Sequence, residues 1–136
     1  MEETNLLDVE IVTPQKTLYE GSAMSVTIPG SKGPFQILNN HAPIVSTLDV
    51  GLTRIVDKAE KPLLYATGAG FTEVHRNKIS ILVENAFEAE KINIDETKDE
   101  LAKLKEALKE SKEDIEIKTA ILEAENKIKA AEKIKS

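Results

Sequence analysis

The sequence predicts an all-β sandwich of about ten short strands in two sheets, followed by an antiparallel two-helix hairpin. Every proline, glycine and aromatic residue lies before position 89, where short apolar runs alternate with turn residues. Half of residues 89–136 are charged, and their apolar residues recur every three or four positions. Strands with frequent turn signals favour a sandwich, and the longer period favours helices. We therefore expect a β-sandwich domain over 1–88 and a helical domain over 89–136.

The expected strands are runs in which apolar and polar residues alternate, because such runs bury one face of a sheet. They cover residues 7–12, 24–28, 35–38, 51–56, 63–66, 71–74 and 79–83. Residues 19–21 (Tyr-Glu-Gly) are expected to interrupt the chain before the second of these strands. The alternation predicts that Met24 points into the core, and Phe71 is expected to pack there as well.

The helical period begins after residue 89. Leu101, Leu104 and Leu108 are spaced three and four apart, as on one face of a helix. Asp95 is expected to cap this helix, and the pair Ser111 and Asp114 resembles a capping box for the next one. The second helix has a narrow apolar seam at Ile117, Ile121, Ala124, Ile128 and Ala131. A short link between two such helices makes them antiparallel neighbours.

Composition excludes several functional classes. The 136 residues carry a net charge of −6 and contain no cysteine. Disulfide frameworks, thiol nucleophiles and cysteine zinc sites are therefore excluded. An acidic chain with few aromatics lacks the basic surface that binds nucleic acid. No apolar run approaches the ~20 residues of a membrane span, and no metal site is expected.

Several segments, in order, resemble one known family. They are the run 26–33 (Val-Thr-Ile-Pro-Gly-Ser-Lys-Gly), the His41-Ala42-Pro43 tripeptide, the strand 51–56, and the run 70–74 (Gly-Phe-Thr-Glu-Val). Together they resemble the epsilon-subunit family of bacterial-type F-type ATP synthases. The resemblance is strong over about 6–88, whereas the helical part matches in length and layout. One departure is Ala69, where the family often has a second glycine.

The resemblance implies a non-catalytic central-stalk (rotor) subunit of a proton-translocating enzyme. Its partners would be the gamma subunit, the ring of c subunits and the alpha/beta catalytic head. The hairpin would fold against the sandwich or extend along gamma, and the extended form would inhibit ATP hydrolysis. The implied location is peripheral, at the cytoplasmic face of the bacterial inner membrane, with membrane contact only through the complex.

The resemblance also implies partner-binding residues. The loop Ser31-Lys32-Gly33-Pro34 would face the c ring, although an exposed hairpin tip is the simpler interpretation. His41-Ala42-Pro43 would lie at a subunit interface, or His41 would only fill a turn. In the extended state, basic residues of the second helix would contact acidic segments of the catalytic subunits. These residues are Lys118, Lys127, Lys129, Lys133 and Lys135.

Some relatives bind ATP in the folded form through an Ile-Asp-x-x-Arg-Ala pattern and two arginines four apart. Here Ile94 and Asp95 match the first part, but Lys98 stands for the arginine. Glu123 and Lys127 occupy the two arginine positions of the second helix. Lysine cannot replace the bidentate phosphate contact of arginine, and Glu123 would repel phosphate. We therefore expect no cofactor and, at most, weak ATP binding.

Two other functions remain open from the sequence. Asp49, His41 and Ser46 supply the residue types of a small hydrolase, although nothing in the sequence orients them. A free-standing sandwich adaptor that dimerises through residues 95–136 is the other alternative, because the narrow seam resembles that of a coiled coil.

Overall fold

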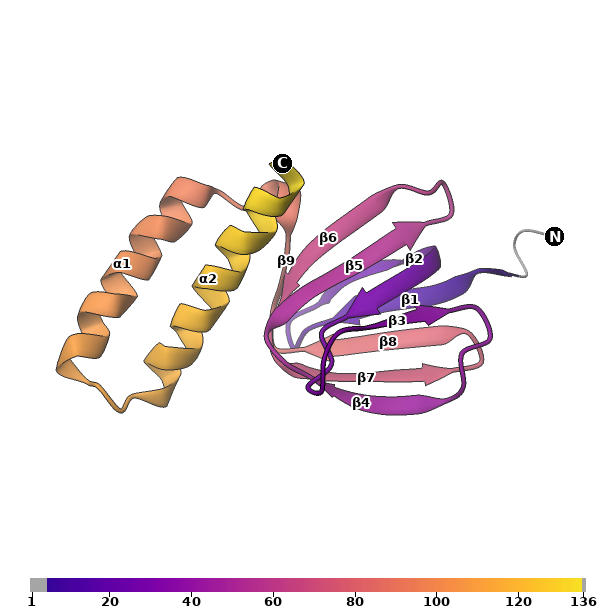
Figure 1. The fold of residues 1–136 in the computed structure, drawn as a ribbon, viewed down its shortest axis with the longest axis horizontal. Coiled ribbons are helices and arrows are strands. Elements are labelled where there is room, and N and C mark those ends of the chain that lie inside the picture. Colours follow the sequence, from indigo (N-terminus) through magenta and orange to yellow (C-terminus); the bar gives the residue numbers. More distant parts are fainter. Residues whose placement is uncertain (1–4, 136) are drawn as a thin grey trace.

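The computed structural model describes residues 5–135 and shows a β-sandwich with a helical hairpin at one end (Figure 1). Its strands are β1 (Leu7–Val12), β2 (Thr17–Ile28), β3 (Phe35–Leu38), β4 (Ile44–Leu48), β5 (Gly51–Asp57), β6 (Pro62–Thr67), β7 (Gly70–His75), β8 (Lys78–Val83) and β9 (Ala86–Glu88). A 3-10 turn, η2 (Ala89–Lys91), leads into the helices α1 (Ile94–Glu110) and α2 (Ile115–Lys135). The predicted sandwich followed by two helices is confirmed.

The nine strands within residues 5–135 form one hydrogen-bonded path that folds into two layers. Its order is β4-β7-β8-β1-β2-β5-β6-β9, and β3 pairs with β2. The first half of β2 pairs with β1, and the second half pairs with β3 and β5. The 12-residue strand β2 therefore passes from one layer to the other, so the two predicted sheets share a strand.

The prediction of a break at residues 19–21 is wrong, because all three lie inside β2. Position 21 is a glycine because a larger side chain would not fit there. A Cβ there would lie 2.9 Å from the Tyr19 hydroxyl. The Tyr19 ring packs edge-on against Tyr65, with centroids 6.2 Å apart. Gly21 thus leaves room for an aromatic pair, and such pairs stabilise sheets by about 0.5–1.5 kcal/mol.

Two predicted core residues point outward. The register of β2 shifts between Ala23 and Ser25, and this irregularity buries Ala23 and Val26 while Met24 is 41% exposed. A bulge resets the two-residue alternation, so alternation alone placed Met24 on the wrong face. On β7, Thr72 and Val74 are buried, and Phe71 is 41% exposed.

The core fills the space between the two layers. Its largest fully buried side chains are aliphatic and come from both layers: Leu7, Ile11, Val26, Ile28, Ile37, Ile55, Ile79 and Ile81. At one end, Asn40 and Asn77 both adopt positive φ, and the Asn40 N–H donates to Oδ1 of Asn77 at 2.6 Å. This bond ties the β3–β4 connection to the β7–β8 turn.

The helix caps differ from those predicted. Asn93, not Asp95, begins α1, because its side-chain oxygen accepts from the Glu96 N–H at 3.0 Å. Asp114 caps α2 by accepting from the Ile117 N–H at 3.2 Å. Ser111 instead ends α1, where its N–H donates to carbonyls of the last turn. The predicted capping box is therefore divided between two helix ends.

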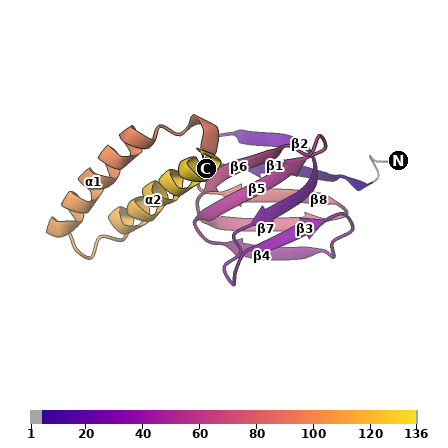
Figure 2. The ribbon, with the colours of Figure 1, turned by 45° about the horizontal axis from the view of Figure 1, so that its top comes forward.

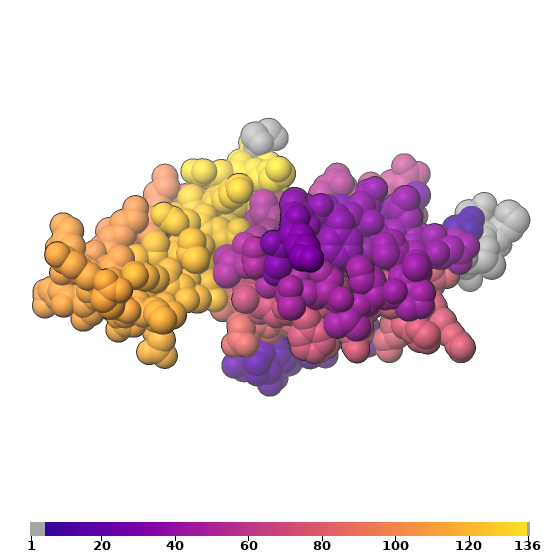
Figure 3. Space-filling view, turned by 60° about the horizontal axis from the view of Figure 1, so that its bottom comes forward, coloured from indigo at the N-terminus to yellow at the C-terminus, as the bar shows by residue number. Residues whose placement is uncertain are grey.

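The hairpin docks through α2. The two views of the ribbon place α2 between α1 and the sandwich (Figures 1 and 2). In the space-filling view, the yellow end of α2 lies against the sandwich while the orange residues of α1 extend away from it (Figure 3). Outside the hairpin, α2 contacts mainly β5, β6 and η2. The face of α2 that meets the sandwich carries Asn126 and Ala130, neither of which belongs to the predicted seam.

Candidate partner-binding surfaces and interdomain cleft

The predicted c-ring loop is an exposed turn between β2 and β3. Ser31, Lys32, Gly33 and Pro34 are all exposed. Ser31 donates from Oγ to Oδ1 of Asp49 at 3.0 Å, and its N–H donates to the Thr47 carbonyl. These bonds fasten the loop to the β4–β5 turn. The loop is therefore exposed to solvent, including the Lys32 side chain, but its backbone is fixed by these hydrogen bonds.

The His41-Ala42-Pro43 segment lies between β3 and β4, at the opposite end of β3 from the Ser31 loop. His41 is half-buried, and Ala42 and Pro43 are exposed. Nδ1 of His41 lies 2.7 Å from the Ala42 carbonyl oxygen, so this nitrogen carries the proton and donates. The two predicted partner-binding segments therefore belong to different ends of the sandwich.

The structure does not assemble the hydrolase candidates into one group. Asp49 accepts from Ser31, His41 contacts the carbonyl of its neighbour, and Ser46 donates from Oγ to the Thr47 carbonyl. A serine nucleophile needs its base within hydrogen-bond reach, with a third group orienting that base. None of these three hydrogen bonds joins two of the candidates.

An outward-facing apolar stripe, missed in the sequence, crosses the β4-β7-β8-β1 layer. Val45 on β4 is 69% exposed and lies diagonal to Phe71 on the neighbouring strand β7, because its direct partner there is Glu73. Leu82 on β8 is opposite Phe71, and Val12 on β1 is opposite Leu82. We call Val12, Val45, Phe71 and Leu82 the apolar stripe. Val45 and Phe71 are exposed, whereas Val12 and Leu82 are half-buried. Apolar side chains gathered on an outer face often mark an interaction surface.

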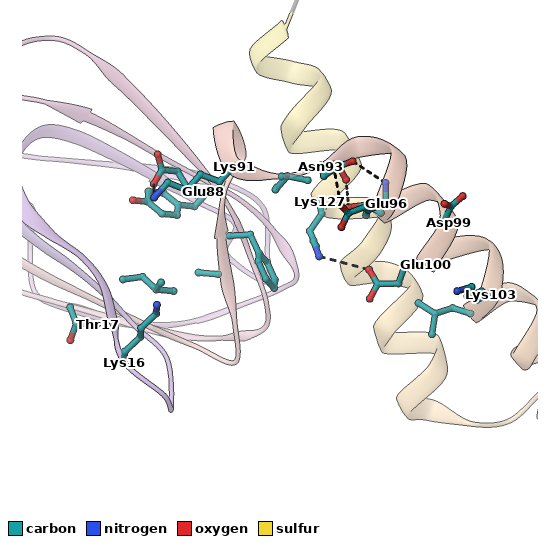
Figure 4. Close-up of a pocket in the computed structure, with 17 residues that line it drawn as sticks. Lys16, Thr17, Glu88, Lys91, Asn93, Glu96, Asp99, Glu100, Lys103 and Lys127 are labelled. Carbon is teal, nitrogen blue, oxygen red and sulfur yellow. Dashed lines mark hydrogen bonds and ion pairs between the residues drawn. The ribbon is translucent and has the colours of Figure 1, made fainter.

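A cleft of about 1120 Å³ separates α1 from the end of the sandwich (Figure 4). The charged residues that line it are Lys16, Lys91, Lys103, Lys127, Glu88, Glu96, Asp99 and Glu100. Four positive and four negative side chains therefore face the same space. Glu96 accepts from Nδ2 of Asn93 at 3.2 Å, and Lys91 pairs with Glu88 at 3.7 Å. The balance of charge gives the cleft no overall preference for an anion.

Lys127 connects three elements at this cleft. Its Nζ lies 3.8 Å from Oε1 of Glu100 on α1 and 4.3 Å from the ring centroid of Phe87 on β9. Figure 4 shows the Lys127 side chain directed at Glu100. A cation over an aromatic face contributes about 0.5–1 kcal/mol at a partly exposed site. Lys127 therefore helps to hold the hairpin together and against β9.

The structure separates the predicted ATP residues. Lys127 lines the cleft, whereas Ile94, Asp95 and Lys98 are not among its lining residues. Asp95 and Lys98 are exposed on α1, and Glu123 is half-buried on α2. The remaining predicted regulatory lysines, Lys118, Lys129, Lys133 and Lys135, are exposed along α2. Lys118 lies 3.7 Å from Glu113 in the link between the helices.

Tyr65 borders the same cleft and is 5% exposed. Burial raises the pKa of Tyr65 to about 12, and the nearby Glu88 and Tyr19 add to the shift. An unfolded tyrosine titrates near pH 10. Below pH 10 the phenol is neutral in both states. Between pH 10 and 12 only the unfolded state ionises, so stability is lost as pH rises through this window.

We expect the free energy of unfolding to fall by up to about 3 kcal/mol between pH 10 and 12 because of Tyr65. In Tyr65→Phe this contribution is absent, so its stability should decline less steeply. Urea unfolding of both proteins at pH 9.5 and 11.5 measures the difference. Equal losses in the two proteins would contradict the assignment.

The contact between α2 and the sandwich is the other feature that the sequence did not reveal. Asn126 is buried and donates from Nδ2 to the Gly51 carbonyl at 2.7 Å. Ala130 packs with Ala66 and Ala89 in a small cluster separate from the main core. The docking face contains asparagine, lysine and alanine, so no hydrophobic period marked it in the sequence.

Comparison with known proteins gives a consistent result. Residues 6–89 match the family model described as "ATP synthase, Delta/Epsilon chain, beta-sandwich domain". The chain is 42% identical to an ATP synthase epsilon chain of Leptospira interrogans, over 72% of this chain and 76% of the relative. It is 34% identical to the chloroplastic ATP synthase epsilon chain of Porphyra purpurea, over 92% of this chain and 95% of the relative. The second match includes the helices.

The solved structures share the fold. A chain in the Euglena gracilis mitochondrial ATP synthase (OSCP/F1/c-ring) superposes with a TM-score of 0.70 and 16% identity, covering 96% of this chain and 80% of that one. A chain of the Tetrahymena thermophila mitochondrial ATP synthase central stalk and c-ring superposes with a TM-score of 0.52 and 20% identity. The superposition covers 62% of this chain and 68% of that one. Within residues 5–135, no helix combines the length and hydrophobicity needed to cross a membrane.

Proposed function

The chain belongs to the ATP synthase delta/epsilon family, and from this membership we propose that it is a central-stalk (rotor) subunit of a proton-translocating F-type ATP synthase. In this role it couples the c ring to gamma and inhibits ATP hydrolysis through its C-terminal helices. It has no active site of its own. The observation that carries the proposal is 34% identity to an epsilon chain over 92% of this chain, because that match spans both the sandwich and the hairpin.

Coupling requires a stiff body with separate surfaces for its partners. The apolar stripe would contact gamma, and it lies on strands outside the main docking contact of α2 with β5, β6 and η2. The exposed Ser31-Lys32-Gly33-Pro34 loop would face the c ring, and His41-Ala42-Pro43 would make a polar contact at a subunit interface. These surfaces are on different parts of the sandwich. By analogy with its epsilon-chain relatives, the subunit would lie at the cytoplasmic face of the bacterial inner membrane, held there through the complex.

Regulation requires an arm that can leave the sandwich. The apolar part of the docking contact is one small cluster, Ala66, Ala89 and Ala130, with a few partly buried neighbours. At about 25 cal/mol per Å² such an interface contributes only a few kcal/mol. Isolated helices of this length are marginal in water, so a partner that binds α2 can compete with docking. The exposed lysines of α2 would then meet acidic segments of the catalytic head.

Reconstitution with gamma and the catalytic head tests the proposal. The full-length chain should associate stably and lower the rate of ATP hydrolysis. A 1–88 truncation should still associate, because it keeps all nine strands, but it should not inhibit. Equal hydrolysis rates would remove the inhibitory role, and failure of both proteins to associate would remove the rotor assignment.

We expect ATP itself to bind at most weakly. The four acidic side chains that line the cleft oppose a polyphosphate, and Lys127 is already paired with Glu100. Thermal unfolding with increasing ATP should therefore show no saturable rise in Tm at micromolar concentrations. A clear rise there would contradict this expectation, and Lys127→Ala would then show whether the cleft is responsible.

The adaptor alternative predicts a different use of the helices. In the structure α1 and α2 pack on each other within one chain, and Lys105 lies 4.0 Å from Glu125 across the pair. We therefore expect a monomer in solution. A concentration-dependent dimer formed through residues 95–136 would favour the adaptor instead.

A further inference from the structure

We propose that Asn126 is the latch that holds the helical hairpin on the sandwich and determines where α2 docks. This deepens the regulatory part of the proposed function and rests on it for its biological meaning. The structural evidence and the decisive measurement concern the isolated chain alone.

The Asn126 side chain lies in the interface and is 9% exposed. Its Nδ2 donates to the Gly51 carbonyl at 2.7 Å and lies 3.4 Å from the Thr67 carbonyl. Both acceptors are backbone oxygens, at the start of β5 and the end of β6. Only the amide nitrogen can bond to them, so the orientation of the Asn126 amide is determined by its partners.

The acceptor is held in place by the sandwich. Oγ1 of Thr67 donates to the same Gly51 carbonyl at 3.3 Å and lies 3.0 Å from Oγ1 of the buried Thr53. Gly51 also packs closely on Pro29, since a Cβ at position 51 would lie 2.6 Å from the Pro29 Cβ. The carbonyl therefore has a defined position before α2 arrives, and α2 supplies a second donor.

This hydrogen bond is a large part of a weak interface. The other fully buried contacts are alanines, which remove little apolar area from water, and Leu52, Leu64 and Ile92 around them are only partly buried. A buried polar group stabilises only when it is bonded, and it costs free energy when its partner is lost. When α2 leaves, however, water reaches both Asn126 and Gly51. The latch therefore favours docking without making release irreversible.

Asn126 also selects the position of α2 along β5 and β6. A shift of α2 by about one turn would place Glu123 or Ala130 opposite the Gly51 carbonyl. An ionised glutamate can only accept a hydrogen bond, and alanine has no polar side-chain atom. Neither residue can replace the amide. A single buried asparagine can specify the register of packed helices in this way.

Hydrogen exchange of the full chain tests the latch, because undocked helices are marginal and their amides exchange on opening. In Asn126→Ala, the protection factors of α2 amides should fall about tenfold, whereas those of β1 and β8 should not change. Thr119→Ala is the matched control, since Thr119 is exposed on the same helix. Both substitutions raise the helix propensity of α2. A loss of protection in Asn126→Ala but not in Thr119→Ala therefore shows weaker docking rather than a weaker helix.

Asn126→Asp is a second and more specific variant. At pH 8 the introduced carboxylate would face two carbonyl oxygens, so α2 protection should fall more than in Asn126→Ala. At pH 5 a protonated carboxyl can donate to Gly51, and protection should partly return. The wild-type chain, measured at both pH values, is the control for the other ionisable groups on the elements that meet here. These groups include Glu123 and Lys127 on α2, Asp49 before β5 and Glu88 on β9.

Two results would overturn the latch: unchanged α2 protection in Asn126→Ala, or an equal loss in β1 and β8, which would mean that Asn126 stabilises the whole fold. The ATPase assay separates this from the proposed function. If Asn126→Ala releases α2 and also strengthens inhibition in the reconstituted complex, both stand. If it releases α2 without changing hydrolysis, the latch stands and the regulatory proposal fails.

Discussion

Replacing Phe71 with glutamate should weaken binding to gamma by about 100-fold while leaving the sandwich folded. Phe71 is 41% exposed, lies opposite Leu82 on β8 and is diagonal to Val45 on β4, whose direct partner is Glu73. Aromatic residues at the centre of an interface often contribute 2 kcal/mol or more. A charge at the same place adds a desolvation cost, and about 2.7 kcal/mol corresponds to the expected factor.

The control for this prediction is Leu38→Glu. Leu38 is 51% exposed and lies on β3, in the opposite layer. Both variants place a charge at an exposed apolar position, so both should keep a Tm near that of the wild type. Association with gamma, measured by titration or co-purification, should be lost only in Phe71→Glu. Loss in Leu38→Glu alone would mean that the other layer binds gamma.

Replacing Gly70 with alanine should destabilise the sandwich by about 3 kcal/mol or more. A Cβ at position 70 would lie 2.0 Å from the Leu82 carbonyl oxygen and 2.8 Å from the Val83 Cα. These are backbone atoms of β8, the strand paired with β7, so no side chain can move aside. The two strands would have to separate locally, and overpacking of this kind costs 1–3 kcal/mol or more.

The expected change in thermal unfolding is a decrease in Tm of roughly 10–20 °C for a domain of this size. Gly33→Ala provides the comparison. At Gly33 φ is +124°, but no atom lies within 4 Å of the added Cβ, so its cost is backbone strain of about 1 kcal/mol. Thermal unfolding followed by circular dichroism ranks the Tm values of the wild type, Gly33→Ala and Gly70→Ala. A Gly70→Ala protein as stable as Gly33→Ala would contradict the steric argument.

Local patterns were sufficient for most elements. The strand Leu7–Val12 has its predicted bounds, and β5 through β8 each include the predicted run. Their alternation reflects a sheet with one buried face, and a two-residue period is visible without knowledge of the partner strands. The helices were equally visible, because their seam repeats every three or four residues. The residues that cap the helices could not be predicted in the same way, because Asn, Asp and Ser near a helix start can all accept a hydrogen bond from the first turn.

The errors arose where a neighbour, rather than the local sequence, decides the geometry. Met24 points outward because a register shift against β5 resets the alternation. Gly21 lies within a strand because its missing side chain accommodates Tyr19. Both effects depend on residues that become adjacent only after folding, so a local pattern cannot contain them.

The amino-acid sequence by itself determined the two-part architecture, the family and the position of the exposed loops, because composition, periodicity and short motifs are local properties. The tertiary structure decided which side chains form surfaces. Val12, Val45, Phe71 and Leu82 become one stripe only when four strands pair in register. Likewise, Asn126 meets Gly51 only when the hairpin returns to the sandwich across 75 residues of chain, and the geometry of a hydrogen bond depends on that return.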